Sequence, residues 1–162
     1  MSDSVGRTGS VSVSVYLASV YRIHGVTFWE SAKTLSEKIE VDGVGIPKRV
    51  TAIPFYFLAS HAAELFLKSA LLKRGFSEGE LKKFSYRHSL KGLLDALQEK
   101  GVSVTPATTA MVSGLHDQHS THALRYTALV DDGQPTDMPP MELVFAMLEE
   151  LLMLTRISTQ GV

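Results

Sequence analysis

Apolar residues recur at helical spacing along most of the chain, most clearly in the segment HAAELFLKSALLKRG at residues 61–75. Ala, Leu and Phe positions there cover nearly the whole circumference of a helix, which is typical of a helix buried on several sides. We expect this helix to begin near residues 52–54. It should end at Gly75, because glycine is the residue type that most often follows a helix C-terminus.

The rest of the pattern predicts more helices and no sheet. The alternation SVSVSVY near the N-terminus would suit a strand, but no second segment is suited to pair with it. We therefore predict an all-α fold, an antiparallel bundle of five to six helices, with residues 1–12 disordered and one domain over residues 13–158. A short helical segment is expected at residues 77–84, and longer helices at 14–24, 27–40, 85–100 (or from 88), 105–124 and 139–156, with loops at 41–49 and 130–140.

The composition is that of an ordinary globular domain, with 44% hydrophobic and 20% charged residues. The chain has no Cys, which excludes disulfides, thiolate metal sites and a thiol nucleophile. No apolar run reaches the roughly 18 residues that span a bilayer. The N-terminus lacks the apolar stretch of a signal peptide, so we expect a cytoplasmic protein with no membrane partner.

The net charge of −1 argues against coating nucleic acid by overall charge. Residues 68–91, however, hold seven Lys or Arg against two Glu. Such a surplus indicates either ordinary solvated helix faces or a surface that binds anions.

Two charged residues interrupt the apolar central helix. Glu64 and Lys68 stand in the i,i+4 relation, with Glu first, which is the favoured order for an ion pair on one helix. Between apolar neighbours, such a pair needs additional polar partners to offset its desolvation. It is therefore either an ion pair at the rim of the bundle or one wall of a polar cleft shared with neighbouring helices.

Three short motifs occur in order along the chain: E-L-x-L-K at residues 64–68, His-Ser-Leu at 88–90, and Arg-Tyr at 125–126. In this combination the chain resembles the HEPN superfamily, small helical domains linked to nucleotide and RNA biology. The resemblance spans residues 50–157. It implies an antiparallel helical bundle, often a homodimer, with a polar cleft between the long helices.

Some members of that superfamily are metal-independent RNases that use an Arg followed after four to six residues by a His. This chain departs from that pattern, because no Arg has a His at that spacing and no His follows Arg125. The departure favours members that bind nucleotides or act as scaffolds. The ligand-binding residues we then expect are Glu64, Lys68, His88, Arg125 and Tyr126, with the cations neutralising phosphate and Tyr126 stacking.

His116, His119 and His122 follow one another at intervals of three. Their directions on a helix diverge, so they do not form a single metal site, and we expect no metal and no cofactor. His119 or His122 on the same face as Arg125 would instead resemble an Arg/His pair in reversed order. In that arrangement a neutral His acts as general base beside an Arg that binds phosphate.

The sequence thus leaves three functions open. The first is a homodimeric domain that binds a nucleotide or RNA without catalysis. The second is an endoribonuclease that uses Arg125 with a non-standard His. The third is a structural bundle that binds a protein partner, in which Glu64 and Lys68 form only an ion pair.

Overall fold

The structure is a computed structural model that describes residues 5–41, 43–45, 52–83, 85–120, 130–131, 134–135 and 139–156. Two-residue strands, β1 (Val130–Asp131) and β2 (Gln134–Pro135), pair antiparallel within the second predicted loop. All other regular structure in these residues is helical, which confirms the predicted all-α fold and helical bundle. The helices are α1 (Val5–Ser36), α2 (Ile53–Leu72), α3 (Glu78–Leu81), α4 (Leu90–Glu99), α5 (Pro106–Ser120) and α6 (Met141–Leu154).

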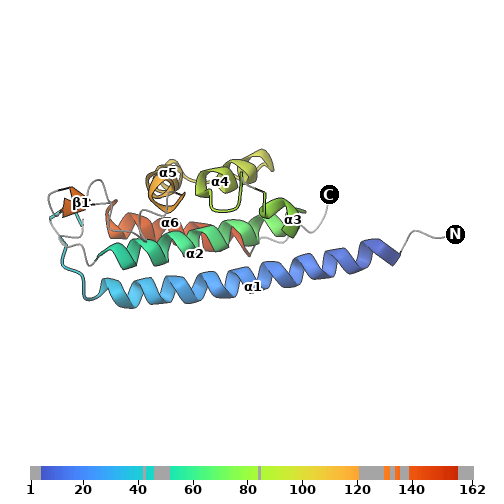
Figure 1. The fold of residues 1–162 in the computed structure, drawn as a ribbon, viewed down its shortest axis with the longest axis horizontal. Coiled ribbons are helices and arrows are strands. Elements are labelled where there is room, and N and C mark those ends of the chain that lie inside the picture. Colours follow the sequence, from blue (N-terminus) through green and yellow to red (C-terminus); the bar gives the residue numbers. More distant parts are fainter. Residues whose placement is uncertain are drawn as a thin grey trace.

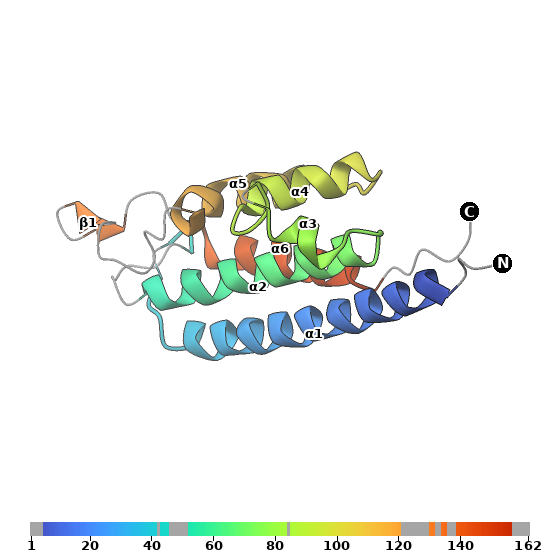
Figure 2. The same cartoon turned by 45° about the vertical axis from the view of Figure 1, so that its right-hand side comes forward.

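Helix α2 lies at the centre of the bundle and packs against four other helices. The long helix α1 runs antiparallel to α2 along one side, while α4 and α5 lie on the opposite side and α6 lies beside α2 (Figure 1). The second view shows the same arrangement, with α1 as an outer layer (Figure 2). This placement explains why α2 is apolar nearly all round: every residue from 62 to 72 is buried.

The ends of α2 agree with the prediction from its flanking residues. Pro54 lies in the first turn, where its missing N–H removes no helical hydrogen bond. At the other end Gly75 has φ +90°, and the N–H of Phe76 donates to the carbonyl of Leu71 at 3.2 Å. This bond closes a turn of the Schellman type, which satisfies carbonyls that the helix itself leaves without donors.

Helix α1 differs from the prediction of two helices over residues 14–24 and 27–40. It is continuous, and it begins at Val5, within the segment expected to be disordered. The physical reason lies at Gly25, where an added Cβ would lie 2.6 Å from the ring of Phe66. Ala18, Gly25 and Ala32 are spaced by seven residues and are all buried, so this stripe of small residues lets α1 approach α2 closely. The glycine is a packing position rather than a helix stop.

The shorter helices begin with side-chain caps. Ser77 and Glu80 form the predicted capping box, although α3 ends at Leu81 rather than near residue 84. Ser89 caps α4, so His88 lies directly before the N-cap of this helix, near its first turn as expected. Thr105 caps α5, and its hydroxyl accepts a hydrogen bond from the N–H of Thr108 at 3.2 Å. Residues 121–124 of the helix predicted over residues 105–124 lie outside the described residues.

Candidate functional site

Glu64 is the most deeply buried charged residue of the described part of the chain, with an exposed fraction of 2%. It lies in the middle of α2, between Ala63 and Leu65, on a helix that is mostly apolar. An ionised carboxylate in such a place is stable only if charged or strongly hydrogen-bonding partners surround it. Three side chains from three parts of the chain supply those partners.

The first partner is Lys68, one turn further along α2. Its ammonium donates to Glu64 Oε1 at 2.5 Å and to the main-chain oxygen of Arg87 at 2.9 Å. The Lys68 side chain is 11% exposed. The predicted i,i+4 pair is thus present, and it is buried rather than placed at the rim of the bundle. The carbonyl of Arg87 is a partner that residue types and spacing alone did not indicate.

The second partner is His119, in the last turn of α5. Its Nε2 lies 2.6 Å from Glu64 Oε2, and the residue is 6% exposed. An ionised carboxylate only accepts hydrogen bonds, so Nε2 carries the hydrogen and donates it to Glu64. This contact joins α5 to α2 across 55 positions of the sequence.

The third partner is His88, in the turn before α4. Its Nδ1 lies 3.4 Å from Glu64 Oε1, and its side chain is 40% exposed. His88 therefore connects the buried carboxylate to the surface. His61, which the sequence did not mark as a site residue, lies further away, with Nδ1 4.0 Å from Glu64 Oε2 and its ring edge-on to Phe28.

The surroundings of Glu64 set its protonation state. Burial by itself raises the pKa of Glu64, but the hydrogen bond from His119 and the charge and hydrogen bond of Lys68 outweigh it and lower the pKa to about 2. The carboxylate is consequently ionised at neutral pH. We refer to Glu64, Lys68, His88 and His119 as the Glu64 cluster.

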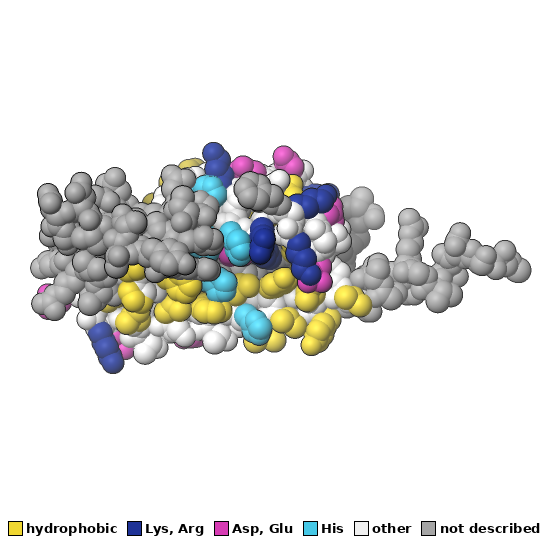
Figure 3. Space-filling model, viewed as in Figure 1, with side chains coloured by type: hydrophobic (Ala, Val, Ile, Leu, Met, Phe, Trp, Pro, Cys, Tyr) yellow, Lys and Arg dark blue, Asp and Glu magenta, His cyan; other side chains and the backbone are white. Residues whose placement is uncertain are grey.

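On the surface, histidine side chains and Lys or Arg side chains gather near the middle of one face, above a band of hydrophobic side chains (Figure 3). Compared with the ribbon in the same view, this group extends from α4 and α5 across α2 (Figures 1 and 3). The exposed Arg87 and Lys91 belong to the basic segment that the sequence identified.

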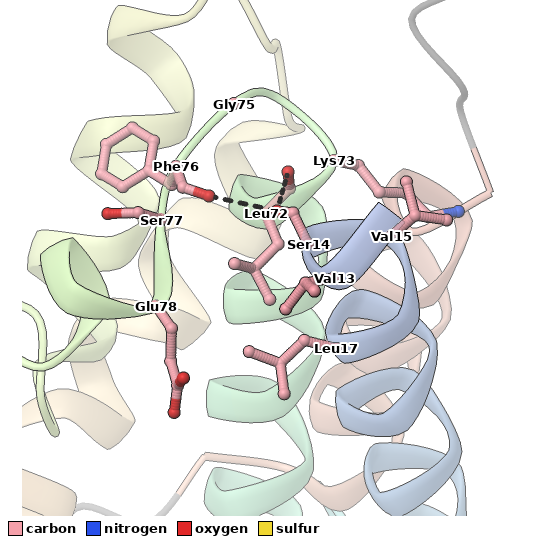
Figure 4. A pocket seen from close by; sticks show the side chains of 10 residues that line it. All are labelled: Val13, Ser14, Val15, Leu17, Leu72, Lys73, Gly75, Phe76, Ser77 and Glu78. Atoms are coloured by element: carbon pink, nitrogen blue, oxygen red, sulfur yellow. Dashed lines mark hydrogen bonds between the residues drawn. The ribbon is translucent and has the colours of Figure 1, made fainter. Parts of the chain in front are cut away.

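A separate cavity of about 540 Å³ lies where α1 passes the C-terminal end of α2 (Figure 4). Its walls include the apolar side chains of Val13, Leu17 and Phe76. The hydroxyl of Ser14 donates to the carbonyls of Leu72 and Phe76 in its wall, both at 3.4 Å. The cavity shares no lining residue with the Glu64 cluster, so it forms a second, apolar region of the molecule.

Of the residues that the sequence singled out, the structure brings together Glu64, Lys68, His88 and His119. His116 is half-buried on α5 and is not part of the Glu64 cluster as described. The remaining candidates, His122, Arg125 and Tyr126, lie outside the described residues. Ligand atoms of Glu64, His88 and His119 all lie within 4.8 Å of one another, so within the part of the chain that the structure describes these three are placed to hold a metal ion.

Comparisons with models of known protein families, with curated proteins and with solved structures found no match. Among the helices of the described residues, none is both long enough and apolar enough to cross a bilayer.

Proposed function

We propose that this helical domain binds a nucleotide or a segment of RNA by its phosphate groups, at the Glu64 cluster, without cleaving it. The position of Lys68 carries the proposal. An ammonium has three N–H donors, and within the described residues two acceptors, Glu64 and the Arg87 carbonyl, engage Lys68. The third donor remains for a phosphate oxygen, on a side chain that is already held in place.

The surface beside Lys68 supports an anionic ligand. Arg87 and Lys91 are exposed, and His88 between them is half-buried against Glu64. Clustered cations raise the local concentration of anions, and a guanidinium donates two parallel hydrogen bonds to a phosphate. Glu64 does not contact the phosphate in this proposal; it orients Lys68 and the two histidines. Arg125 and Tyr126 remain the predicted residues for a second phosphate contact and for stacking on a base.

The proposal excludes catalysis for two reasons. The spacing used by RNases of the resembled superfamily, a His four to six residues after an Arg, does not occur in the chain. In addition, Nε2 of His119 donates to Glu64 at 2.6 Å, so that nitrogen has no lone pair for a general base. Nucleotides and RNA are present in the cytoplasm, so such a ligand agrees with the cytoplasmic location that the sequence predicts.

We further propose that the domain binds this ligand as a homodimer that pairs through α1. Val13, Tyr16 and Ile23 are 62%, 70% and 59% exposed, although all three are large and apolar. Together with Val20 they are spaced by three, four and three residues, which places them in one stripe of the kind that forms the seam between paired helices. Light scattering should give the mass of two chains for the native protein and of one chain for the double variant Tyr16→Glu, Ile23→Glu.

Ligand binding is tested by thermal unfolding with a panel of nucleoside phosphates and short RNAs. A ligand at about 100 times its dissociation constant adds about 2.7 kcal/mol to the free energy of unfolding. Arg87→Ala should weaken binding by about tenfold, because a charge-assisted hydrogen bond is lost while the exposed side chain contributes little to stability. Lys38→Ala, which removes an exposed cation at the end of α1, is the matched control and should leave binding unchanged.

The opposite results are equally informative. No shift with any of these ligands would overturn the proposal and favour the structural bundle, whose partner is a protein. A shift of equal size in Arg87→Ala and in the native protein would place the ligand elsewhere. Cleavage of RNA that disappears in Arg125→Ala would replace the binding domain with the endoribonuclease hypothesis.

A further inference from the structure

Three side chains with metal-ligating atoms meet at one point of the bundle. A carboxylate oxygen of Glu64 and one ring nitrogen each of His88 and His119 lie within 4.8 Å of one another. The ring nitrogens recorded nearest to Glu64 are Nδ1 of His88 and Nε2 of His119. They come from α2, from the turn before α4 and from the end of α5, so the meeting point is produced by the packing of three elements. No pair of these residues is closer than 24 positions in the sequence.

The distances suit a first-row transition metal. Bonds of about 2.0–2.2 Å from zinc to His nitrogen and carboxylate oxygen place tetrahedral ligands about 3.4 Å apart. His88 Nδ1 lies 3.4 Å from Glu64 Oε1, the carboxylate oxygen that Lys68 also contacts, so a metal bound through Oε2 requires the His88 ring to move toward that oxygen. His119 Nε2 lies 2.6 Å from Glu64 Oε2, the length of a direct hydrogen bond, so these two atoms need to separate by less than 1 Å. The imidazole of His119 then carries its hydrogen on Nδ1 instead of Nε2.

Lys68 decides which ions fit. Its hydrogen bond to Glu64 Oε1 fixes the orientation of the carboxylate and leaves the other oxygen for a metal, as hydrogen-bonding neighbours of metal ligands commonly do. Its positive charge opposes ions such as Mg²⁺ and Ca²⁺, which bind oxygen ligands mainly by charge. Two imidazoles with one carboxylate instead favour Zn²⁺ and its first-row neighbours.

We propose that Glu64, His88 and His119 form a site for one divalent transition-metal ion per chain, with Zn²⁺ as the best fit and Lys68 holding the carboxylate. Three protein ligands leave a coordination position open to a water or a phosphate oxygen. The half-exposed side chain of His88 provides the entry path from solvent. This inference goes beyond the proposed function and does not rest on it, because the metal alone serves as the probe.

The test is calorimetric titration of ZnCl₂ into metal-stripped, tag-free protein. We expect one ion per chain. His88→Ala should weaken binding by about 100-fold or more, because one of the few ligands is lost. His24→Ala, which removes an exposed histidine from α1, should leave it unchanged. Since His119→Ala also removes a buried partner of Glu64, its fold is first checked by circular dichroism, and His88→Ala serves as the independent variant.

Co²⁺ provides a second reading, since a four-coordinate site gives intense visible absorption that a loosely bound ion lacks. Its appearance in the native protein and its loss in His88→Ala would support the site. Zn²⁺ binding that persists in His88→Ala, or that falls equally in His24→Ala, would overturn it. Failure to bind Zn²⁺ at about 10 µM would also overturn it, and would leave nucleotide binding measured in the presence of a chelator unaffected.

Discussion

Both ends of α5 are held by a glutamate from another helix, but the two glutamates have different partners. Glu150 on α6 accepts hydrogen bonds from the N–H and hydroxyl of Thr105, at 2.8 and 2.7 Å, and from the hydroxyl of Thr108 at 2.5 Å. All three donors are neutral. Glu64 on α2 accepts from His119 at the other end of α5, and also from the ammonium of Lys68.

The difference separates a structural carboxylate from a functional candidate. The donors to Glu150 belong to the N-cap residue and the first turn of α5, where a negative charge also stabilises the N-terminal end of the helix dipole. Capping therefore explains Glu150 completely. Glu64 has more partners than the attachment of α5 requires, since Lys68 bonds to it and His88 approaches it from the surface. Attaching the end of α5 does not explain why Lys68 and His88 also surround Glu64.

The largest effect is expected for Lys68→Met, which leaves the carboxylate of Glu64 buried without its ammonium. Removing one partner of a buried ion pair costs about 3–5 kcal/mol, to be measured by urea denaturation. Lys82→Met is the matched control, because Lys82 and Glu78 form a pair with the same i,i+4 spacing that is exposed to solvent. That variant should leave the free energy of unfolding almost unchanged, because solvent screens an exposed ion pair.

The double variant Glu64→Leu, Lys68→Met sharpens the same test. It removes both charges, so part of the stability lost in Lys68→Met should return, as happens when apolar residues replace a buried ion pair. Equal losses in Lys68→Met and Lys82→Met would mean that Glu64 and Lys68 behave as a solvated pair, and the distinction from Glu150 would fail.

The second prediction concerns the loss of stability at acidic pH. The pKa of Glu64 is lowered from 4.5 to about 2 in the folded protein, so the ionised carboxylate stabilises the fold. This contribution is fully present above about pH 5 and is lost as the pH falls toward 2, by about 3 kcal/mol at most. Urea denaturation from pH 6 to pH 2.5 should show the decline. Glu64→Gln, which cannot ionise, should be less stable at pH 6 and should lose less on acidification; parallel curves for the two proteins would contradict the prediction.

Sequence reasoning succeeded where the determining contacts are local. Pro54 and Gly75 delimit α2, and the spacing of Glu64 and Lys68 places both on one face of one helix. Sequence reasoning failed where the contact joins residues that are far apart in the sequence. The divergence of His116 and His119 around α5 was predictable, but which of them faces α2 depends on how α5 packs, 55 positions after Glu64.

Two features that the sequence did not predict share one cause, because packing between elements decided them. Gly25 suggested a break between helices, yet the ring of Phe66 on α2 occupies the space that a side chain would need. The sequence did not single out Tyr16 and Ile23, and only the path of α1 along α2 shows that they face away from the bundle. Periodicity identifies an apolar face, but it does not say which partner covers that face.

The smallest effect is expected at Glu150. Burial raises the pKa of Glu150, but the hydrogen bonds from Thr108 and Thr105 outweigh it and lower the pKa, so its ionised form also stabilises the fold. Glu150→Gln keeps an acceptor for these neutral donors and loses only the charge, which should cost about 1 kcal/mol at pH 6. The adjacent exposed Glu149→Gln is the control and should change stability by less than about 0.5 kcal/mol. The contrary result is that Glu150→Gln lowers the free energy of unfolding as much as Lys68→Met does. Neutral donors would then hold a carboxylate as strongly as charged donors do, and the cationic partners of Glu64 would no longer distinguish it from Glu150.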